Sequence, residues 1–143
     1  FKIFGYGWNR VRRGSPLRKY VDARNIYGAA LRRAVADAIA CVNLLRPQNQ
    51  GSHNMRTFEI PAMGGLLLTQ RTTEQQSFFP EEEASLMFGD SEELGNQLSR
   101  ILTAPDQFGH IRQRGYELAR AHTYTNRARE LLTLVTSTLS FHR

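Results

Sequence analysis

A polar loop that runs into a predicted helix carries most of the chemistry in this sequence. Ser52, His53, Asn54 and Arg56 place side-chain hydrogen-bond donors in the first turn and a half of that helix. The unpaired backbone N–H groups and the positive dipole end of a helix N-terminus attract anions. The segment 52–65, which follows an apolar strand-like run, therefore predicts a phosphate site.

Glu59 lies on the same helix and has two interpretations. A carboxylate beside an anion site repels phosphate, unless it accepts hydrogen bonds from another group such as the two hydroxyls of a ribose. Alternatively, it forms an ion pair with Arg56, three residues earlier on the same helical face. The residues alone favour the ion pair. Gly64 and Gly65 likewise either end the helix or let a ligand approach the backbone closely.

Other kinds of site find little support in the sequence. Gly5 and Gly7 form a Gly-x-Gly after a predicted strand and are candidates for loop contacts, but the rest of a dinucleotide fingerprint is missing. The histidines are scattered, and Cys41 is predicted to be a buried, unreactive thiol in an apolar run. The acidic run 81–83 is predicted to be a solvated turn, so no metal site is expected. No Ser-His-Asp arrangement or Walker loop occurs.

Alternating strands and helices must position these residues. Ser52 and Ser91 are predicted to cap their helices, and the helix after Ser52 should stop at Gly64-Gly65. Apolar runs predict strands at residues 2–6, 20–23, 38–45, 66–69 and 85–88. Helical spacing predicts helices at 25–36, 52–63, 91–102, 105–121 and 125–139, and residues 72–79 are predicted to be a short helix or a turn. This order predicts an α/β fold with one core, in which a parallel sheet carries helices on both faces. Ligands bind beyond the carboxyl ends of such strands.

Composition bounds the function without choosing it. The 143 residues are 41% apolar, with a net charge of +6 and a pI of about 10.1, and Lys2 and Lys19 are the only lysines. An arginine-rich surface suits phosphate-bearing ligands, nucleic acid or anionic lipid headgroups. No apolar run is long enough to span a membrane, so a cytoplasmic protein is expected. Because the chain begins at Phe1 and enters a strand directly, we expect a piece of a longer polypeptide.

A series of motifs resembles the C-terminal domain of family-1-like glycosyltransferases of the spore-maturation-protein type. The resemblance covers residues 6–132, and its motifs occur in the family's order and at its intervals. They are the run 58–69 (FEIPAMGGLLLT), Phe78-Phe79, Ser91-Glu92-Glu93-Leu94, Gly115-Tyr116-Glu117, and His122-Thr123-Tyr124 through Arg127-Ala128-Arg129. The resemblance implies that residues 1–143 form the Rossmann-like C-terminal lobe of a two-lobed GT-B fold, whose N-terminal lobe is a partner from the same polypeptide.

The resemblance also implies a substrate and a set of contacts. The donor would be a nucleotide-diphosphate sugar. Its sugar would be transferred without a metal ion or cofactor, in a hexosyltransferase-like reaction. Glu59 would contact the ribose hydroxyls, and the helix N-terminus with Arg56 would stabilise the leaving nucleoside diphosphate. The family motif has a further carboxylate eight positions earlier, where this sequence has Gly51. The donor contacts implied are Ser52, His53, Asn54, Arg56, Thr57, Glu59, Gly64 and Gly65.

Two further interpretations stay open at this point. A basic module that binds nucleic acid or an anionic surface would account for the charge, although the arginines are scattered and no aromatic-flanked basic motif marks a nucleic-acid site. The same charge could hold an enzyme at a membrane that carries its acceptor. A lobe that binds nucleotide or acts only as a scaffold is the third interpretation. The residues identify neither the acceptor nor a catalytic group, and the isolated lobe should not transfer sugar.

Overall fold

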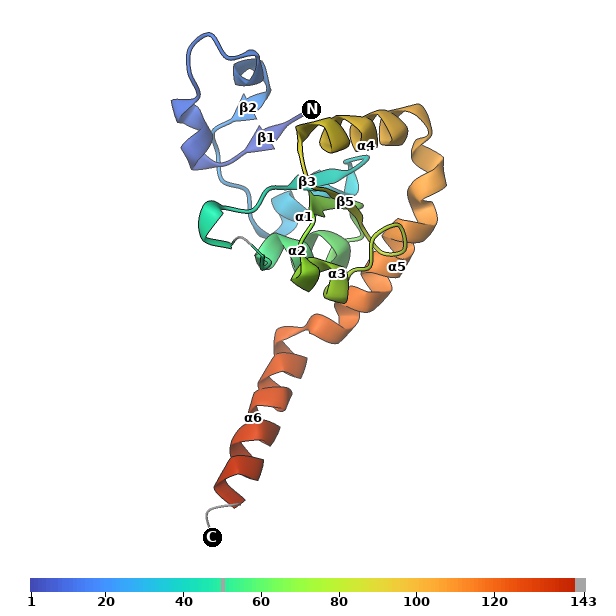
Figure 1. Ribbon diagram of the computed structural model, residues 1–143. Coiled ribbons are helices and arrows are strands. Elements are labelled where there is room, and N and C mark those ends of the chain that lie inside the picture. The colour runs from blue at the N-terminus through green and yellow to red at the C-terminus, as the bar shows by residue number, and fades with distance from the viewer. Residues whose placement is uncertain (50, 141–143) are drawn as a thin grey trace. The chain divides into compact units, whose positions relative to one another are not determined.

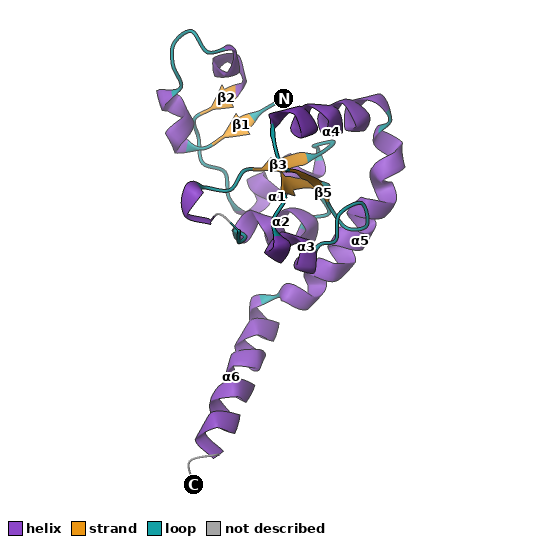
Figure 2. Cartoon of the chain, in the orientation of Figure 1, coloured by secondary structure: helices purple, strands orange, loops and turns teal. Residues whose placement is uncertain are grey.

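The structure is a computed structural model that describes residues 1–49 and 51–140 (Figure 1). The chain divides into two compact units, Phe1–Ala34 and Val35–Arg143. Strands and helices alternate from residue 3 to residue 88, and helices alone follow, as the colouring by secondary structure shows (Figure 2). Among the described residues, no helix is long and apolar enough to cross a lipid bilayer.

The first unit is built on two very short parallel strands. Strand β1 (Ile3–Phe4) pairs with β2 (Val21–Asp22), and 3-10 turns at Tyr6–Arg10 and Pro16–Tyr20 fill the connection between them. None of residues 1–34, all of which the structure describes, has a buried side chain. Helix α1 (Gly28–Ala36) follows and leads into the second unit.

The second unit contains a three-stranded parallel sheet in the order β3-β4-β5. Its strands are β3 (Cys41–Asn43), β4 (Leu67–Gln70) and β5 (Leu86–Phe88). Helix α2 (Met55–Ala62) connects β3 to β4, and α3 (Thr73–Phe78) connects β4 to β5. The chain then continues through helices alone: α4 (Ser91–Thr103), α5 (Gly109–Ala119) and α6 (Tyr124–Ser140).

The two faces of this sheet differ, because one of them buries the polar Asn43 and Thr69 along with apolar side chains. Because successive side chains of a strand point to opposite faces, Leu68 and Thr69 lie on different sides of β4. The Leu68 face is apolar and is packed by α4 and the start of α5, through the cluster Leu66, Leu68, Leu86, Phe88, Ile101, Phe108 and Ile111. The Thr69 face is polar next to α2, where Thr69 is paired in register with Asn43. Both faces are covered by helices, which confirms the predicted α/β class.

The N-terminus of α2 is fixed by its own sequence. Asn54 precedes the helix in an extended conformation, and its side chain accepts a hydrogen bond from the backbone N–H of Thr57. The Thr57 hydroxyl in turn accepts from the backbone N–H of Asn54, which completes a capping box. The helix ends one residue after Pro61, as expected for a proline that cannot continue the hydrogen-bonding ladder.

Two of the predicted helix caps are wrong by one or two residues. Asn54 caps α2 instead of Ser52, and Asp90 caps α4 instead of Ser91. A cap residue must lie outside the helix with an extended backbone, as Asp90 does with φ −142°. Ser91 is already the first helical residue, so its side chain cannot take that position.

Four of the five predicted strands are too long, the fifth (66–69) is shifted by one residue, and the predicted burial near β3 is wrong. Ile39 and Leu44 belong to the run predicted as a strand covered on both faces, yet they are 48% and 53% exposed. Strand β3 is an edge strand that pairs only with β4, so fewer neighbours cover its ends. Cys41 is half-buried, and that burial raises the pKa of its thiol.

The sequence also predicted a single sheet and an apolar face on the helix 25–36. Hydrogen bonding instead divides the strands into a sheet in each unit. Of α1, only Val35 is buried, and Tyr27 is 71% exposed. The predicted single core does form, and it lies in residues 35–143.

Candidate functional site

The candidate site lies where β3 and β4 end, beside the N-terminus of α2. The loop between β3 and α2 folds on itself, because the Asn49 side-chain amide donates to the backbone carbonyl of His53 at 3.3 Å. Gly51 has a positive φ of 80°, which glycine adopts without strain. Asn54 then begins the helix. This loop presents the predicted residues Ser52, His53 and Asn54 next to one another.

A carboxylate from another helix joins this loop. Oε2 of Glu74, in the first turn of α3, lies 2.5 Å from Ser52 Oγ and 2.6 Å from His53 Nδ1. The hydrogen bond from Ser52, and then that from His53, lowers the pKa of Glu74. Thr72, the cap of α3, donates through its hydroxyl to the backbone carbonyl of Ser52 at 2.9 Å. The loop is therefore tied to the start of α3.

Arg56 and Glu59 form an ion pair on α2. A guanidinium nitrogen of Arg56 lies 2.8 Å from Glu59 Oε2, and the two side chains are 42% and 32% exposed. This is the second of the two interpretations of Glu59, and it is the one that the structure shows. Both groups remain accessible from solvent, so a ligand could still reach either one.

Thr57 points inward, unlike its neighbours Arg56 and Glu59. Its side chain is fully buried, and its hydroxyl donates to Gln75 Oε1 at 2.9 Å. The amide of Asn43 donates to the hydroxyls of Thr57 and Thr69 at 3.4 and 3.2 Å. Asn54 also donates to Asn43 Oδ1 at 3.0 Å, so the cap of α2 belongs to the same buried network. The Thr57 side chain therefore helps to fix α2 in place from inside the fold.

The two predicted glycines lie at the opposite end of α2 from Ser52. Gly64 has a positive φ of 77° just after the helix ends. A Cβ atom added to Gly65 would lie 2.5 Å from Val35 Cγ1, so this glycine is needed for close packing. The helix is eight residues long, and its two ends are about 12 Å apart at 1.5 Å per residue. The structure does not bring these glycines to the anion-attracting end.

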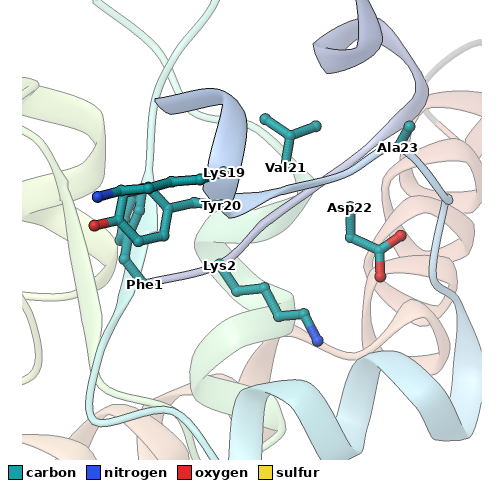
Figure 3. Close-up of a pocket in the computed structure, with 7 residues that line it drawn as sticks. All are labelled: Phe1, Lys2, Lys19, Tyr20, Val21, Asp22 and Ala23. Atoms are coloured by element: carbon teal, nitrogen blue, oxygen red, sulfur yellow. The ribbon is translucent and has the colours of Figure 1, made fainter. Parts of the chain in front are cut away.

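Gly5 and Gly7 belong to the first unit. Gly5 has φ 136°, and a Cβ atom added to it would lie 3.3 Å from Cδ1 of Trp8. A shallow pocket of about 410 Å³ also lies in this unit, away from the predicted donor residues in sequence. Its lining includes both lysines of the chain, and Phe1 packs edge-on against Tyr20 with ring centroids 5.6 Å apart (Figure 3).

An aromatic cluster of His53, Phe58, Phe78 and His122 packs beside the candidate site. The His53 ring packs edge-on against Phe58 of α2 and Phe78 of α3, at 5.3 and 5.2 Å between centroids. His122, just before α6, packs on the same two phenylalanines at 5.1 and 5.3 Å. Burial, and then the nearby charge of Arg127, lowers the pKa of His122. Segments far apart in the sequence thus meet around Phe58 and Phe78.

Two kinds of group in this arrangement attract an anion, and the carboxylates of Glu59 and Glu74 oppose them. The first-turn N–H groups of α2 and the Arg56 guanidinium are positive, and they lie beyond the carboxyl ends of two parallel strands. Among the residues that the structure describes, no group of three or more His, Cys, Asp or Glu side chains could hold a metal ion. The family described as glycosyl transferase-like matches residues 1–133.

The chain belongs to this glycosyl transferase-like family. The match covers both units and nearly the whole chain, which confirms the resemblance drawn from the motifs. No curated protein matches the chain. The parallel α/β architecture is that of a Rossmann-like glycosyltransferase domain, and the protein is accordingly a transferase of the glycosyltransferase type.

Sequence reasoning missed Glu74, Asn43 and Gln75 in this glycosyltransferase domain. Glu74 is 22 residues from Ser52, and nothing in its local sequence distinguishes it from other helix carboxylates. The order of parallel strands could have indicated that Glu74 lies near Ser52. Parallel strands end at the same edge of a sheet, so the residues that follow β4 must lie near those that follow β3.

The acidic run 81–83 lies in the exposed turn that the sequence predicted, and each of its carboxylates is also paired with an arginine. Glu81 binds Arg71 at 2.7 Å, Glu82 binds Arg100 at 2.7 Å, and Glu83 binds Arg114 at 3.1 Å. The three arginines follow or belong to β4, α4 and α5. The run therefore connects three parts of the second unit.

Proposed function

We propose that the second unit of this glycosyltransferase domain binds a nucleotide-diphosphate sugar at the N-terminus of α2. In this proposal the first-turn N–H groups and Arg56 receive the diphosphate. Charge builds on the leaving phosphates as the glycosidic bond breaks, and fixed positive groups that are already in place stabilise that charge. The observation that supports the proposal best is the partly exposed Arg56–Glu59 pair in a capped helix at the carboxyl edge of the sheet.

Glu59 is proposed to accept hydrogen bonds from the ribose hydroxyls. Its pairing with Arg56 does not prevent this role, because the carboxylate has four acceptor positions and Arg56 uses one oxygen. The ion pair would hold the carboxylate in one orientation and offset its repulsion of the diphosphate. His53, held by Glu74 through Nδ1, is proposed to turn its Nε2 atom towards the donor.

Sugar transfer itself is proposed to need a second lobe. The acceptor and any general base would lie on that lobe, so residues 1–143 should bind donor without transferring sugar. Neither a metal ion nor a cofactor enters this proposal. The second unit supplies one half of the reaction, which is the binding of the donor and the stabilisation of its leaving group.

Calorimetric titration with UDP, GDP and ADP tests the proposal. We expect one of them to bind, and replacing Arg56 by glutamine to weaken binding about tenfold or more, because a hydrogen bond to a charged group contributes about 1.5–3 kcal/mol. The matched control is Arg127→Gln, because Arg127 and Glu130 form the same i, i+3 pair at 2.9 Å on α6. Equal losses in both variants would contradict the proposed site.

Pyrophosphate separates the role of Glu59 from that of Arg56. Arg56→Gln should weaken both the nucleotide and pyrophosphate, whereas Glu59→Ala should weaken only the nucleotide, because pyrophosphate has no ribose. Glu130→Ala is the control for Glu59→Ala. If Glu59→Ala binds the nucleotide as tightly as the unaltered protein does, the ribose role is wrong.

A further inference from the structure

The net positive charge of this protein comes from one unit. Residues 1–34 contain nine lysines and arginines and one acidic residue, so their formal charge is +8. Residues 35–143 contain ten arginines and twelve acidic residues, and their formal charge is −2. The arginines occur throughout the chain, as the sequence shows, but nearly all the carboxylates that could neutralise them lie in the second unit.

The single acidic residue of the first unit does not offset the other cations. Asp22 is engaged by Arg24, whose Nε and Nη2 atoms lie 2.9 and 2.7 Å from its two oxygens. These hydrogen bonds lower the pKa of Asp22 to about 2, so it stays ionised and paired at neutral pH. Lys2 also acts on Asp22 through its charge, and the other lysines and arginines of residues 1–34 have no carboxylate of their own unit left to pair with.

In the second unit, several arginines are paired with carboxylates. Arg71, Arg100 and Arg114 each bind a carboxylate of the run 81–83, and Arg71 also binds Glu93. These ion pairs link different elements of the second unit. In the first unit all nine basic side chains are exposed, and their charge is directed to solvent.

Apolar side chains are exposed between these cations. Tyr6, Trp8 and Leu17 are 65%, 37% and 40% exposed. They belong to the two 3-10 turns, and the exposed Arg10, Arg12 and Arg13 lie between them in the sequence. A surface that combines tryptophan, tyrosine and leucine with arginine has the composition of one that binds the headgroup region of an anionic bilayer.

We propose that residues 6–19 form a docking surface for an anionic lipid bilayer, separate from the donor site on α2. The cations would meet the negative headgroups, while Trp8 and Leu17 enter the region between headgroups and acyl chains. A lipid surface fits better than duplex nucleic acid. The major groove accepts an α-helix or a two-stranded ribbon, whereas residues 6–19 form only five-residue 3-10 turns joined by a loop.

The protein carries its own probe for this surface, because Trp8 is its only tryptophan. Phosphatidylcholine vesicles that contain one third phosphatidylglycerol should shift the Trp8 emission to shorter wavelength, and pure phosphatidylcholine vesicles should not. Binding should weaken as salt is raised, because salt screens exposed charges. An unshifted emission, or binding that is insensitive to salt, would overturn the proposal.

Variants locate the surface. Replacing Arg10, Arg12 and Arg13 by glutamine should weaken vesicle binding about a hundredfold, since each cation near an anionic bilayer contributes about a fivefold factor. The control removes the same charge from the second unit, at the exposed Arg46, Arg120 and Arg129, and should retain most of the binding. Equal losses in the two triple variants would show that only net charge matters and would overturn the proposal. Tighter binding to duplex or single-stranded DNA than to the vesicles, at one salt concentration, would overturn it in favour of nucleic acid.

Discussion

The two units of this chain use charge and burial in opposite ways. Residues 1–34 have no buried side chain, a formal charge of +8 and strands of two residues. Residues 35–143 have a formal charge of −2 and a sheet whose strands are mostly buried, with arginines that pair with carboxylates. Burial of side chains therefore provides most of the stability of the second unit. The first unit has little of this support, and its side chains are available for contacts with other molecules.

The largest effect should come from apolar burial. Leu68 of β4 has no exposed surface, whereas Leu17 is 40% exposed. Leu68→Ala should lower the free energy of unfolding by about 2–5 kcal/mol, because it leaves a cavity in the core. Leu17→Ala should change it by about 0.5 kcal/mol or less. Urea denaturation measures both, and similar values for the two variants would contradict the difference between the units.

Buried polar groups should give the next largest effect. Asn43 connects Asn54, Thr57 and Thr69 inside the second unit, while Asn25 of the first unit accepts one exposed hydrogen bond from the backbone N–H of Tyr6. Asn43→Ala should cost about 1–3 kcal/mol, since it leaves buried partners unsatisfied. Asn25→Ala should cost clearly less in the same denaturation experiment. A larger loss from Asn25 would show that the first unit stabilises the whole chain.

Gly115 and Gly14 differ in the space around their Cα atoms, one in each unit. A Cβ atom on Gly115 of α5 would lie 2.7 Å from the Ala84 carbonyl oxygen, whereas one on Gly14 would have no atom within 4 Å. Gly115→Ala should destabilise by about 1–3 kcal/mol through overpacking. Gly14→Ala should be neutral, or stabilising by at most about 1 kcal/mol, because it restricts the unfolded chain. Thermal unfolding of the two variants tests this contrast.

The smallest expected effects are changes in stability at low pH. Hydrogen bonds with arginine lower the pKa of Glu93 and of Asp22 to about 2, from 4.5 and 3.8 in the unpaired groups. Each pair therefore contributes stability above the unpaired value, and that contribution is lost as the pH falls towards 2. Glu93→Gln should flatten the dependence of the unfolding midpoint on pH between 4.5 and 2.

Asp22→Asn provides the matched test in the first unit. We expect it to change the Trp8 emission in this acidic range and to leave the unfolding midpoint of the second unit unaltered. A shift of that midpoint as large as the one from Glu93→Gln would contradict the separate roles of the two units.

Much of the fold could be predicted from local pattern. The apolar run 66–69 and the helical spacing after Ser91 each contain enough information to define an element, because burial of one strand or one helical face requires that pattern. The exact caps could not be predicted. Ser52 and Asn54 are both good cap residues, and the backbone conformation of the loop decided between them.

The candidate site was predictable only along α2 itself. Arg56 and Glu59 are three residues apart, so their pairing follows from helical geometry alone. The contact of Glu74 with Ser52 and His53 joins residues that are 21 and 22 positions apart. It depends on where α3 starts relative to the loop before α2, which sequence spacing does not specify.

The sequence by itself determined the α/β class, the presence of a helix that ends before Gly64 and the excess of arginine, because these depend on residue type and local spacing. Its motifs also indicated the glycosyltransferase family. Only the tertiary structure decided that Thr57 points inward, that Gly65 is required for packing against Val35, and that Glu74 joins the loop. These features arise where parallel strands bring distant segments to one edge of a sheet, and contacts between distant segments leave no periodic pattern in a single sequence.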